Sequence, residues 1–253
     1  MSKRRGQPKL VESGGAAKPP RLNRVNHFEL AYQRIEDLLI NCELRPGRFL
    51  AMQELQEITG FGRTPVHNAV NRLAADTLII VRPRHGLQIA PIDLARERLL
   101  LQLRRDIERF VVRLATERST RSHRNQMLHL ERALRERRDK ITLMEFNNMD
   151  RRINKLIMDS ANEPFLEHTL RPLHTIFRRI GFIYHTHMPG LPTVTGSVDH
   201  HLALLDAVAN SHVELAVAAS DALIQFMDGM FEVMEKDIDP VLLDHSIEPL
   251  FTS

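Results

Sequence analysis

The chain has 253 residues, of which 43% are hydrophobic and 26% charged, and its net charge is +3. This length allows two modest domains with separate cores, and the hydrophobic content excludes a wholly disordered chain. No apolar run approaches the roughly 18 residues of a membrane span, and the basic N-terminus lacks the apolar segment of a signal peptide. Cys42 is the single cysteine, which excludes an intrachain disulfide and suits a reducing compartment, so we expect a cytoplasmic protein.

Residues 1–24 form a basic arm with seven Lys or Arg residues against one acidic residue, Glu12. The pairs Gly14-Gly15 and Pro19-Pro20 add to a composition for which we expect disorder. Because the rest of the chain is acidic on balance, the arm is suited to lie along DNA phosphates. A solubilising tail without a specific target is the alternative.

The next segment, 25–92, has the pattern of three helices followed by a hairpin. Apolar residues at helical spacing predict helices over 28–42, 52–59 and 64–75. Gly60 is suited to end the second helix, and Pro65 is tolerated in the first turn of the third. Two β-prone runs, 78–81 and 87–89, flank the basic tip Arg82-Pro83-Arg84-His85-Gly86. This order predicts a winged helix-turn-helix that binds DNA; the alternative is a small helical domain whose exposed faces are merely polar.

The helix over 64–75 is the expected recognition helix, because such a helix presents its N-terminal side chains to base edges in the major groove. Arg63 suits guanine or a phosphate, and Asn68 or Asn71 suits adenine. We expect Thr64 to bond a phosphate while also capping the helix. The basic tip suits the minor groove or the DNA backbone, and glycine there permits close approach. The expected DNA contacts are Arg45, Arg63, Thr64, Pro65, His67, Asn68, Asn71, Arg72, Arg84, His85 and Gly86.

Beyond Pro91 only helical patterns follow, and they predict an all-helical second domain over 93–253. The expected helices are 93–118, 121–138, 141–161, 164–187, 194–210 and 212–236. Six helices of this length are typical of a bundle. The predicted fold class is therefore mainly α, with an N-terminal winged helix-turn-helix followed by an all-helical ligand-binding bundle.

The first domain resembles the DNA-binding domain of GntR-family transcription regulators. The motifs that carry the resemblance are Arg45-Pro46-Gly47, Glu54-Leu55, Gly60-Phe61-Gly62-Arg63-Thr64-Pro65-Val66 and His85-Gly86. The chain departs from the family pattern at two positions. His67 replaces a usual arginine that generally reads a base, so the operator sequence is open, and Thr77 replaces a common glycine before the first wing strand.

The second domain resembles the FCD branch of that family, whose helical domain is similar to that of the fatty-acid-responsive regulator. The matching segments are Leu103-Arg104-Arg105-Asp106-Ile107-Glu108, Asp150 with Asn154 and Ser160-Ala161-Asn162, His201-Leu202-Ala203-Leu204-Leu205-Asp206-Ala207, and Ala216. Many members hold a divalent metal with one Asp and three His, and the metal binds a small carboxylate effector. Carried over residue by residue, these ligands fall on Asp150, Asn154, His201 and Leu223.

The resemblance implies an effector pocket formed by Arg104, Asp150, Asn154, His201 and Leu223. Asp150, Asn154 and His201 are the candidate metal ligands, but an amide oxygen suits zinc poorly and Leu223 offers no donor. We therefore favour a metal-free or weakly metallated pocket in which Arg104 pairs with the effector carboxylate. The alternative for Arg104 is a structural partner of Asp150 or Glu108.

The leading hypothesis is a homodimer that binds a palindromic double-stranded operator, with a small organic acid changing operator affinity. The family resemblance implies that it acts as a repressor. One alternative is an architectural DNA-binding dimer without a ligand. Another is a metal-dependent hydrolase that uses Asp150, His201 and a water, although the chain lacks a nucleophile motif, an HExxH motif and a glycine-rich phosphate loop. We expect no enzyme and no membrane association.

Overall fold

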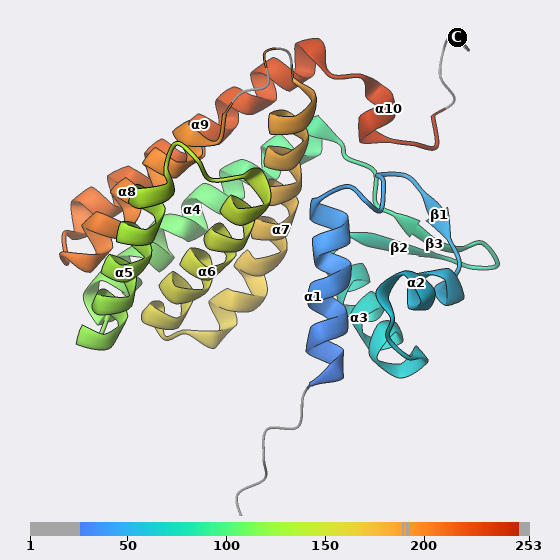
Figure 1. Ribbon diagram of the computed structural model, residues 1–253, viewed down its shortest axis with the longest axis horizontal. Coiled ribbons are helices and arrows are strands. Elements are labelled where there is room, and N and C mark those ends of the chain that lie inside the picture. The colour runs from blue at the N-terminus through green and yellow to red at the C-terminus, as the bar shows by residue number, and fades with distance from the viewer. Residues whose placement is uncertain (1–25, 189, 191–192, 248–253) are drawn as a thin grey trace, which may run out of the picture.

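A computed structural model describes residues 26–188, 190 and 193–247, so the expected basic arm at 1–24 lies outside the described residues. The chain forms a small winged helix-turn-helix domain beside a larger helical bundle (Figure 1). This confirms the predicted fold class. No helix in the described part of the chain is long and apolar enough to cross a membrane.

The first domain consists of α1 (His27–Ile40), β1 (Phe49–Leu50), α2 (Met52–Thr59), α3 (Arg63–Ala75), β2 (Ile79–Arg82) and β3 (Gly86–Ile89). The strands form an antiparallel sheet in the order β1-β3-β2. Its core packs Tyr32, Ile35 and Leu39 of α1 against the buried stripe of α3, which is Val66, Ala69, Val70 and Leu73 as the periodicity predicts.

Two features of this domain differ from the sequence prediction. Helix α1 ends at Ile40 rather than Cys42, because Cys42 adopts a left-handed conformation with a φ of 52°. Strand β1 was not predicted, because two residues carry no recognisable alternation. It exists through its pairing with β3, where Phe49 lies opposite Gln88 and Leu50 opposite Leu87.

The backbone conformation at Thr77 explains why glycine is common at this position in the family. The residue stands between α3 and β2 with a φ of 61°, a conformation that glycine adopts freely and a β-branched residue adopts only with strain. Its hydroxyl accepts a hydrogen bond of 3.0 Å from Arg96 Nη2, which offsets part of this cost. We expect Thr77→Gly to raise the free energy of unfolding by roughly 1 kcal/mol. Urea denaturation checks this, and a loss of stability would show that the exposed hydrogen bond outweighs the strain.

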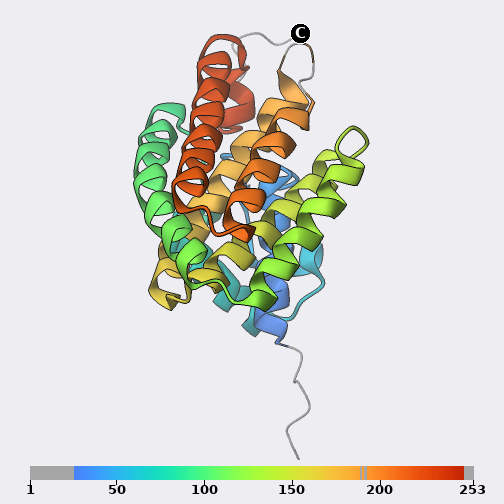
Figure 2. The same ribbon diagram turned by 90° about the vertical axis from the view of Figure 1, so that its left-hand side faces the viewer.

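Within the residues that the structure describes, the second domain contains six long helices and one short one. They are α4 (Leu94–Arg118), α5 (Arg121–Arg137), α6 (Leu143–Ala161), α7 (Pro164–His187), α8 (Thr195–Ala209), α9 (Val213–Asp237) and α10 (Pro240–Leu243). Helix α9 packs against both α4 and α8, and α5 packs against α8 (Figure 2). Several ends follow local capping: Thr142 and Glu145 form a capping box at the start of α6, and Asn162 ends that helix in a left-handed conformation.

The two domains are joined by packing as well as by the chain. Helix α1 lies along α7, and Ile176 of α7 belongs to the core of the small domain (Figure 1). The segment after α9 returns to the junction, where Ile92 N donates to Leu243 O (2.8 Å) and His245 N donates to Pro46 O (2.7 Å). The short helix α10 was not predicted, and these bonds give it an ordered role at the junction.

Glu97 is a buried carboxyl near this junction, with 4% of its surface exposed. Burial raises its pKa to about 7, although the nearby Arg179 opposes the shift. The folded chain therefore holds this proton over a range in which the unfolded chain has released it. The contribution of Glu97 to the free energy of unfolding is fully present below the ordinary pKa of 4.5 and is lost as the pH rises toward about 7. We expect stability to fall by up to about 3 kcal/mol across this range and Glu97→Gln to flatten that slope. Urea denaturation at several pH values checks this, and an equal slope in both proteins would contradict it.

Candidate nucleic-acid interface and bundle cavity

The exposed face of α3 gathers most of the predicted DNA contacts. Gly60, with a φ of 74°, ends α2 and turns the chain into α3. While the apolar stripe of α3 is buried, its other face is open to solvent and carries Arg63, Thr64, His67, Asn68 and Asn71. Thr64, His67, Asn68 and Asn71 occupy positions i, i+3, i+4 and i+7 and so share one side of the helix. Pro65, in the first turn, is half-buried beside them.

Thr64 does not cap α3. The helix begins at Arg63 with Gly62 as its N-cap, and no side chain caps this end. Thr64 thus lies inside the first turn, where its hydroxyl stays exposed. The prediction of a capping role was wrong because the glycine turn ends one residue earlier than expected.

Arg72 faces the protein rather than the exposed side of α3. Its guanidinium lies 4.6 Å from the ring centre of Tyr32 and 5.8 Å from that of Phe28. It also lies 3.5 Å from the Glu29 carboxylate. All three partners belong to α1, so Arg72 fixes α3 to α1 and is left out of the DNA-binding surface.

Arg45 is exposed, but it lines a cavity with Phe182 and His187 of α7 and Val241 of α10. It therefore faces the domain junction, and we also leave it out. At the wing tip, Arg84 and His85 are exposed as predicted. The fold itself requires glycine at position 86, because its φ is 84° and an added Cβ would lie 2.8 Å from the Leu50 carbonyl oxygen. Close approach of β1, rather than of DNA, explains this glycine.

A small cavity of about 50 Å³ lies inside the bundle and unites four of the five predicted effector residues. Arg104, Asp150, His201 and Leu223 line it, whereas Asn154 does not. Asn154 lines a separate cavity of about 120 Å³ between α1, α6 and α7. The remaining walls of the bundle cavity include Phe146, Phe177 and Met227 and the residues His174, Arg178 and His185.

Asp150 is the centre of the polar contacts in this cavity. Its Oδ1 accepts from His201 Nε2 at 2.9 Å and from Asn154 Nδ2 at 3.0 Å, and its Oδ2 lies 3.4 Å from Arg178 Nε. Burial alone would raise the pKa of Asp150, but the His201 hydrogen bond and the Arg178 charge lower it below the ordinary value. Asp150 is therefore ionised. His201 Nδ1 also faces an acceptor, the Ser197 carbonyl at 2.7 Å, so His201 rather than its neighbour His200 occupies the predicted position.

Glu108 is a second buried carboxylate, and it holds Arg104. Arg104 Nε donates to Glu108 Oε1 at 3.1 Å, and His174 Nε2 lies 2.7 Å from the same oxygen. Burial opposes the charge, but His174 and Arg104 lower the pKa of Glu108 to about 2. Arg104 is thus the structural partner of Glu108, which was the alternative that the sequence left open.

The donors in this cavity do not fit a divalent metal. Asp150 is already contacted by a guanidinium cation, which would repel a metal ion at the same carboxylate. Asn154 directs its amide nitrogen to Asp150, and Leu223 contributes only apolar surface. Among the described residues, no three His, Cys, Asp or Glu side chains are placed to hold a metal ion.

Arg178 links this cavity to the DNA-binding domain, and sequence reasoning missed it. Together with His174 it lines both the bundle cavity and the cavity beside α1. Its Nη2 lies 4.0 Å from Glu36 of α1, its Nε is near Asp150, and its buried Nη1 has no hydrogen-bond partner. The available signal was the charged pair Arg178-Arg179 within the apolar run of α7.

Glu36 is the residue of α1 that Arg178 and its neighbours on α6 and α7 contact. It is 3% exposed, and its carboxylate accepts a hydrogen bond of 2.5 Å from the Thr175 hydroxyl. Arg151 of α6 lies 3.4 Å from Glu36 and also contacts Asp37. A buried ionic network therefore runs from Asp150, inside the bundle, to α1, which packs directly on α3.

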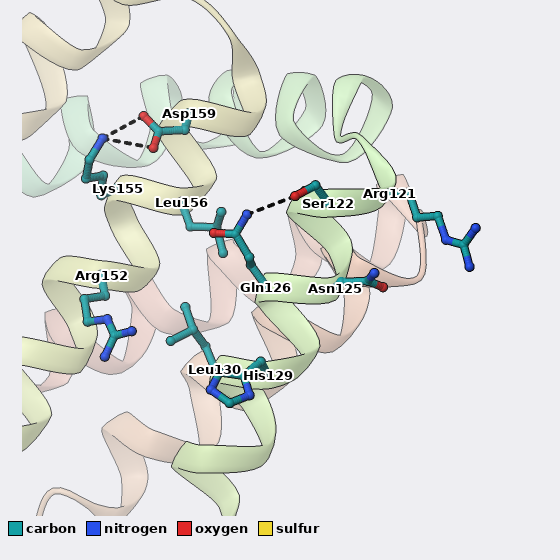
Figure 3. Close-up of a pocket in the computed structure, with 10 residues that line it drawn as sticks. All are labelled: Arg121, Ser122, Asn125, Gln126, His129, Leu130, Arg152, Lys155, Leu156 and Asp159. Atoms are coloured by element: carbon teal, nitrogen blue, oxygen red, sulfur yellow. Dashed lines mark hydrogen bonds and ion pairs between the residues drawn. The ribbon is translucent and has the colours of Figure 1, made fainter.

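A larger, open groove of about 650 Å³ lies between α5 and α6 (Figure 3). All its lining residues except Leu130 and Leu156 are exposed. Lys155 Nζ lies 2.9 Å from both carboxylate oxygens of Asp159. The groove shares no lining residue with the bundle cavity, so its size does not make it the effector site.

Comparisons with known proteins agree with both domains. The model of the bacterial regulatory proteins of the gntR family matches residues 29–89, and that of the FCD domain matches residues 99–226. The HTH-type transcriptional repressor RspR of Escherichia coli (strain K12) is 27% identical over 160 residues, which are 62% of this chain and 69% of RspR. The HTH-type transcriptional regulator McbR of the same strain is 23% identical over 222 residues, covering 87% of this chain and 96% of McbR.

Solved structures share the fold. The structure of E. coli McbR/YncC covers 83% of this chain and 98% of its own, with a TM-score of 0.70 and 20% identity. A GntR regulator from Rhodococcus sp. RHA1 covers 81% and 97%, with a TM-score of 0.61 and 15% identity. Since the matching families are transcription regulators and not enzymes, the hydrolase alternative is set aside. The chain belongs to the GntR family of bacterial regulatory proteins and is a DNA-binding transcription regulator with an FCD domain.

Proposed function

We propose that this regulator is a repressor that binds a palindromic operator as a homodimer and changes its operator affinity when a small organic acid enters the bundle cavity. The observation that carries the proposal is Arg178, whose side chain stands between that cavity and α1 with one buried nitrogen unpartnered. A buried N–H donor without a hydrogen-bond acceptor lowers the stability of the fold, so a ligand that accepts from it is favoured.

The DNA-binding surface consists of the exposed face of α3 and the wing tip. In each half-site, Arg63, His67, Asn68 and Asn71 face base edges in the major groove, while Thr64 contacts a phosphate and Pro65 packs at the start of the helix. Arg84 and His85 at the wing contact the minor groove or the backbone. The polar, hydrogen-bonding character of this face supports the assignment, because base edges are read by such groups.

The effector is small and anionic. A cavity of about 50 Å³ holds a few water molecules or a ligand of a few heavy atoms, not a fatty acid. A carboxylate matches the fork of a guanidinium, and Arg178, which lines that cavity, has a buried Nη1 without a hydrogen-bond partner. A bound carboxylate competes with Asp150 and Glu36 for Arg178. It thereby changes how firmly the bundle holds α1, and with it the position of α3.

The experiment that tests this proposal begins by selecting operator DNA from a random library with the full-length protein. Binding to the selected operator is then measured with and without formate, acetate and other short carboxylates, with chloride at equal ionic strength as the control. We expect a symmetric operator and at least one acid that weakens binding. The small cavity also favours the ligand-independent dimer, and an operator affinity unchanged by every acid would support that candidate instead.

A further inference from the structure

A cavity of about 340 Å³ lies where the two domains meet, and we call it the junction cavity. Its lining residues fall within the segments 41–46, 182–187 and 241–245. These segments are the loop after α1, the end of α7 and the helix α10 with the residues that follow it, and they lie at the same end of the molecule (Figure 1). The junction cavity shares no lining residue with the bundle cavity, so the two are separate sites.

The walls of the junction cavity carry basic groups and no acidic ones among the described residues. The ionisable side chains that line it are Arg45, His187, His245 and Cys42. The guanidinium of Arg45 forms no ion pair with any side chain that the structure describes. A cation without a counter-ion, beside two imidazoles, is suited to bind an anion.

The nearest acidic residues along the chain do not neutralise these groups within the cavity. Glu43 and Asp244 adjoin lining segments in the sequence, but neither side chain lines the cavity. Asp244 Oδ1 accepts hydrogen bonds from Ser246 N at 2.9 Å and from Ser246 Oγ at 2.7 Å. This carboxylate is therefore engaged within its own turn.

Arg179 adds a buried cation next to the wall. It is 2% exposed, and its charge acts on the thiol of Cys42. Its Nε and Nη2 are buried and have no hydrogen-bond partner among the described residues. Glu97 also acts on Arg179, but its pKa is raised to about 7, so this carboxyl offsets the Arg179 charge only in part near neutral pH. In such a poorly solvated place, an uncancelled charge extends its attraction into the cavity.

The remaining walls are apolar. Pro46 and Ile183 are buried, and Phe182, Val241 and Leu242 are half-buried. Ligand pockets in proteins are mostly apolar with a few polar groups that fix orientation, and they span roughly 300–1,000 Å³. The junction cavity has both properties, whereas the bundle cavity, at about 50 Å³, is far smaller.

We infer that the junction cavity binds a second ligand, an organic anion with an apolar body. Its anionic group meets Arg45, with His187 and His245 beside it. Its body packs on Phe182, Ile183 and Leu242. This inference goes beyond the proposed effector of the bundle cavity, because it concerns different residues and a larger ligand.

A ligand in this place contacts both domains at once. Residues 41–46 belong to the DNA-binding domain, and the other two segments belong to the helical domain. Pro46 O accepts from His245 N at 2.7 Å, and the adjacent Gly47 N donates to Ile89 O of β3 at 3.0 Å. The wall of the cavity is thus bonded to a strand of the wing. Binding therefore favours the relative position of the two domains in which both sides reach the ligand.

Alkylation of Cys42 tests the inference, because Cys42 lines the cavity and is the single cysteine of the chain. The full-length protein is treated with iodoacetamide, and mass spectrometry follows the modification of Cys42. The probe is 3-phenylpropanoate, and the uncharged 3-phenylpropanamide is the control of the same shape, with chloride at equal ionic strength. At ten times its dissociation constant, the acid should slow alkylation by roughly tenfold. The amide should protect Cys42 much less at the same concentration.

Arg45→Met tests which group holds the anion. Arg45 is exposed and unpaired with described side chains, so the fold should not change. We expect the dissociation constant of 3-phenylpropanoate to rise by about tenfold or more, because a charge-assisted hydrogen bond is lost. Arg132→Met is the matched control at an exposed arginine of α5, and it should leave the protection unchanged. Each variant is compared with its own rate without ligand, and circular dichroism melting confirms that it folds.

Each contrary result overturns a defined part of the inference. An alkylation rate that stays the same at every concentration of 3-phenylpropanoate overturns the site. Equal protection by the acid and the amide overturns the anionic class of the ligand. Protection that survives Arg45→Met overturns Arg45 as the anion's partner. The operator experiment with formate and acetate probes the bundle cavity, so its failure leaves the Cys42 result standing, and the reverse also holds.

Discussion

Replacing Arg178 with methionine should lower the free energy of unfolding by about 3–5 kcal/mol. The substitution keeps much of the side-chain volume but removes the cation between Asp150 and Glu36, which are 6% and 3% exposed. Two buried carboxylates then lose a shared partner, and uncompensated buried charge is among the most costly defects in a protein. Urea denaturation followed by circular dichroism measures the loss.

Arg132→Met is the matched control, because Arg132 is exposed on α5 and its loss should cost well under 1 kcal/mol. A double-mutant cycle identifies the cause: in the Glu36→Gln background, Arg178→Met should cost less than in the wild type. A cost for Arg178→Met no larger than that of Arg132→Met would show that water, rather than Arg178, stabilises these carboxylates.

The secondary structure could be predicted wherever its signals are local. The end of α2 at Gly60 and the break between α6 and α7 at Asn162-Glu163-Pro164 depend on the backbone preferences of those residues, which the sequence displays directly. Strand β1 and helix α10 are short and depend on partners far along the chain, β3 and the domain junction. No local pattern indicates such elements.

The site could be predicted in part for a related reason. The spacing of four residues brings Asp150 and Asn154 together, and they do form a hydrogen bond of 3.0 Å. Which cavity each side chain lines depends on how α6 packs against α1 and α7, so Asn154 was assigned to the wrong one. Arg178 was missed because its role comes from two carboxylates on different helices, Asp150 on α6 and Glu36 on α1.

Arg63→Ala should weaken binding to the selected operator by roughly 30-fold or more. A lost base contact costs about 1–3 kcal/mol, and a two-fold complex loses it in both half-sites. The side chain is exposed at the first turn of α3, so the fold should not change. Fluorescence anisotropy with labelled operator measures the affinity, and Arg132→Ala on α5 is the control that removes one positive charge at another exposed site.

The pattern of the Arg63→Ala loss across sequences reveals which contact was removed. If Arg63 reads guanine, affinity for the selected operator falls while affinity for random DNA changes little, and preference relaxes at one base pair in each half-site. If Arg63 binds a phosphate, affinity falls equally for both DNAs and the dependence of binding on salt becomes shallower. An affinity equal to that of the wild type on both DNAs would contradict a DNA contact by Arg63, and Arg84→Ala at the wing is then the variant to measure next.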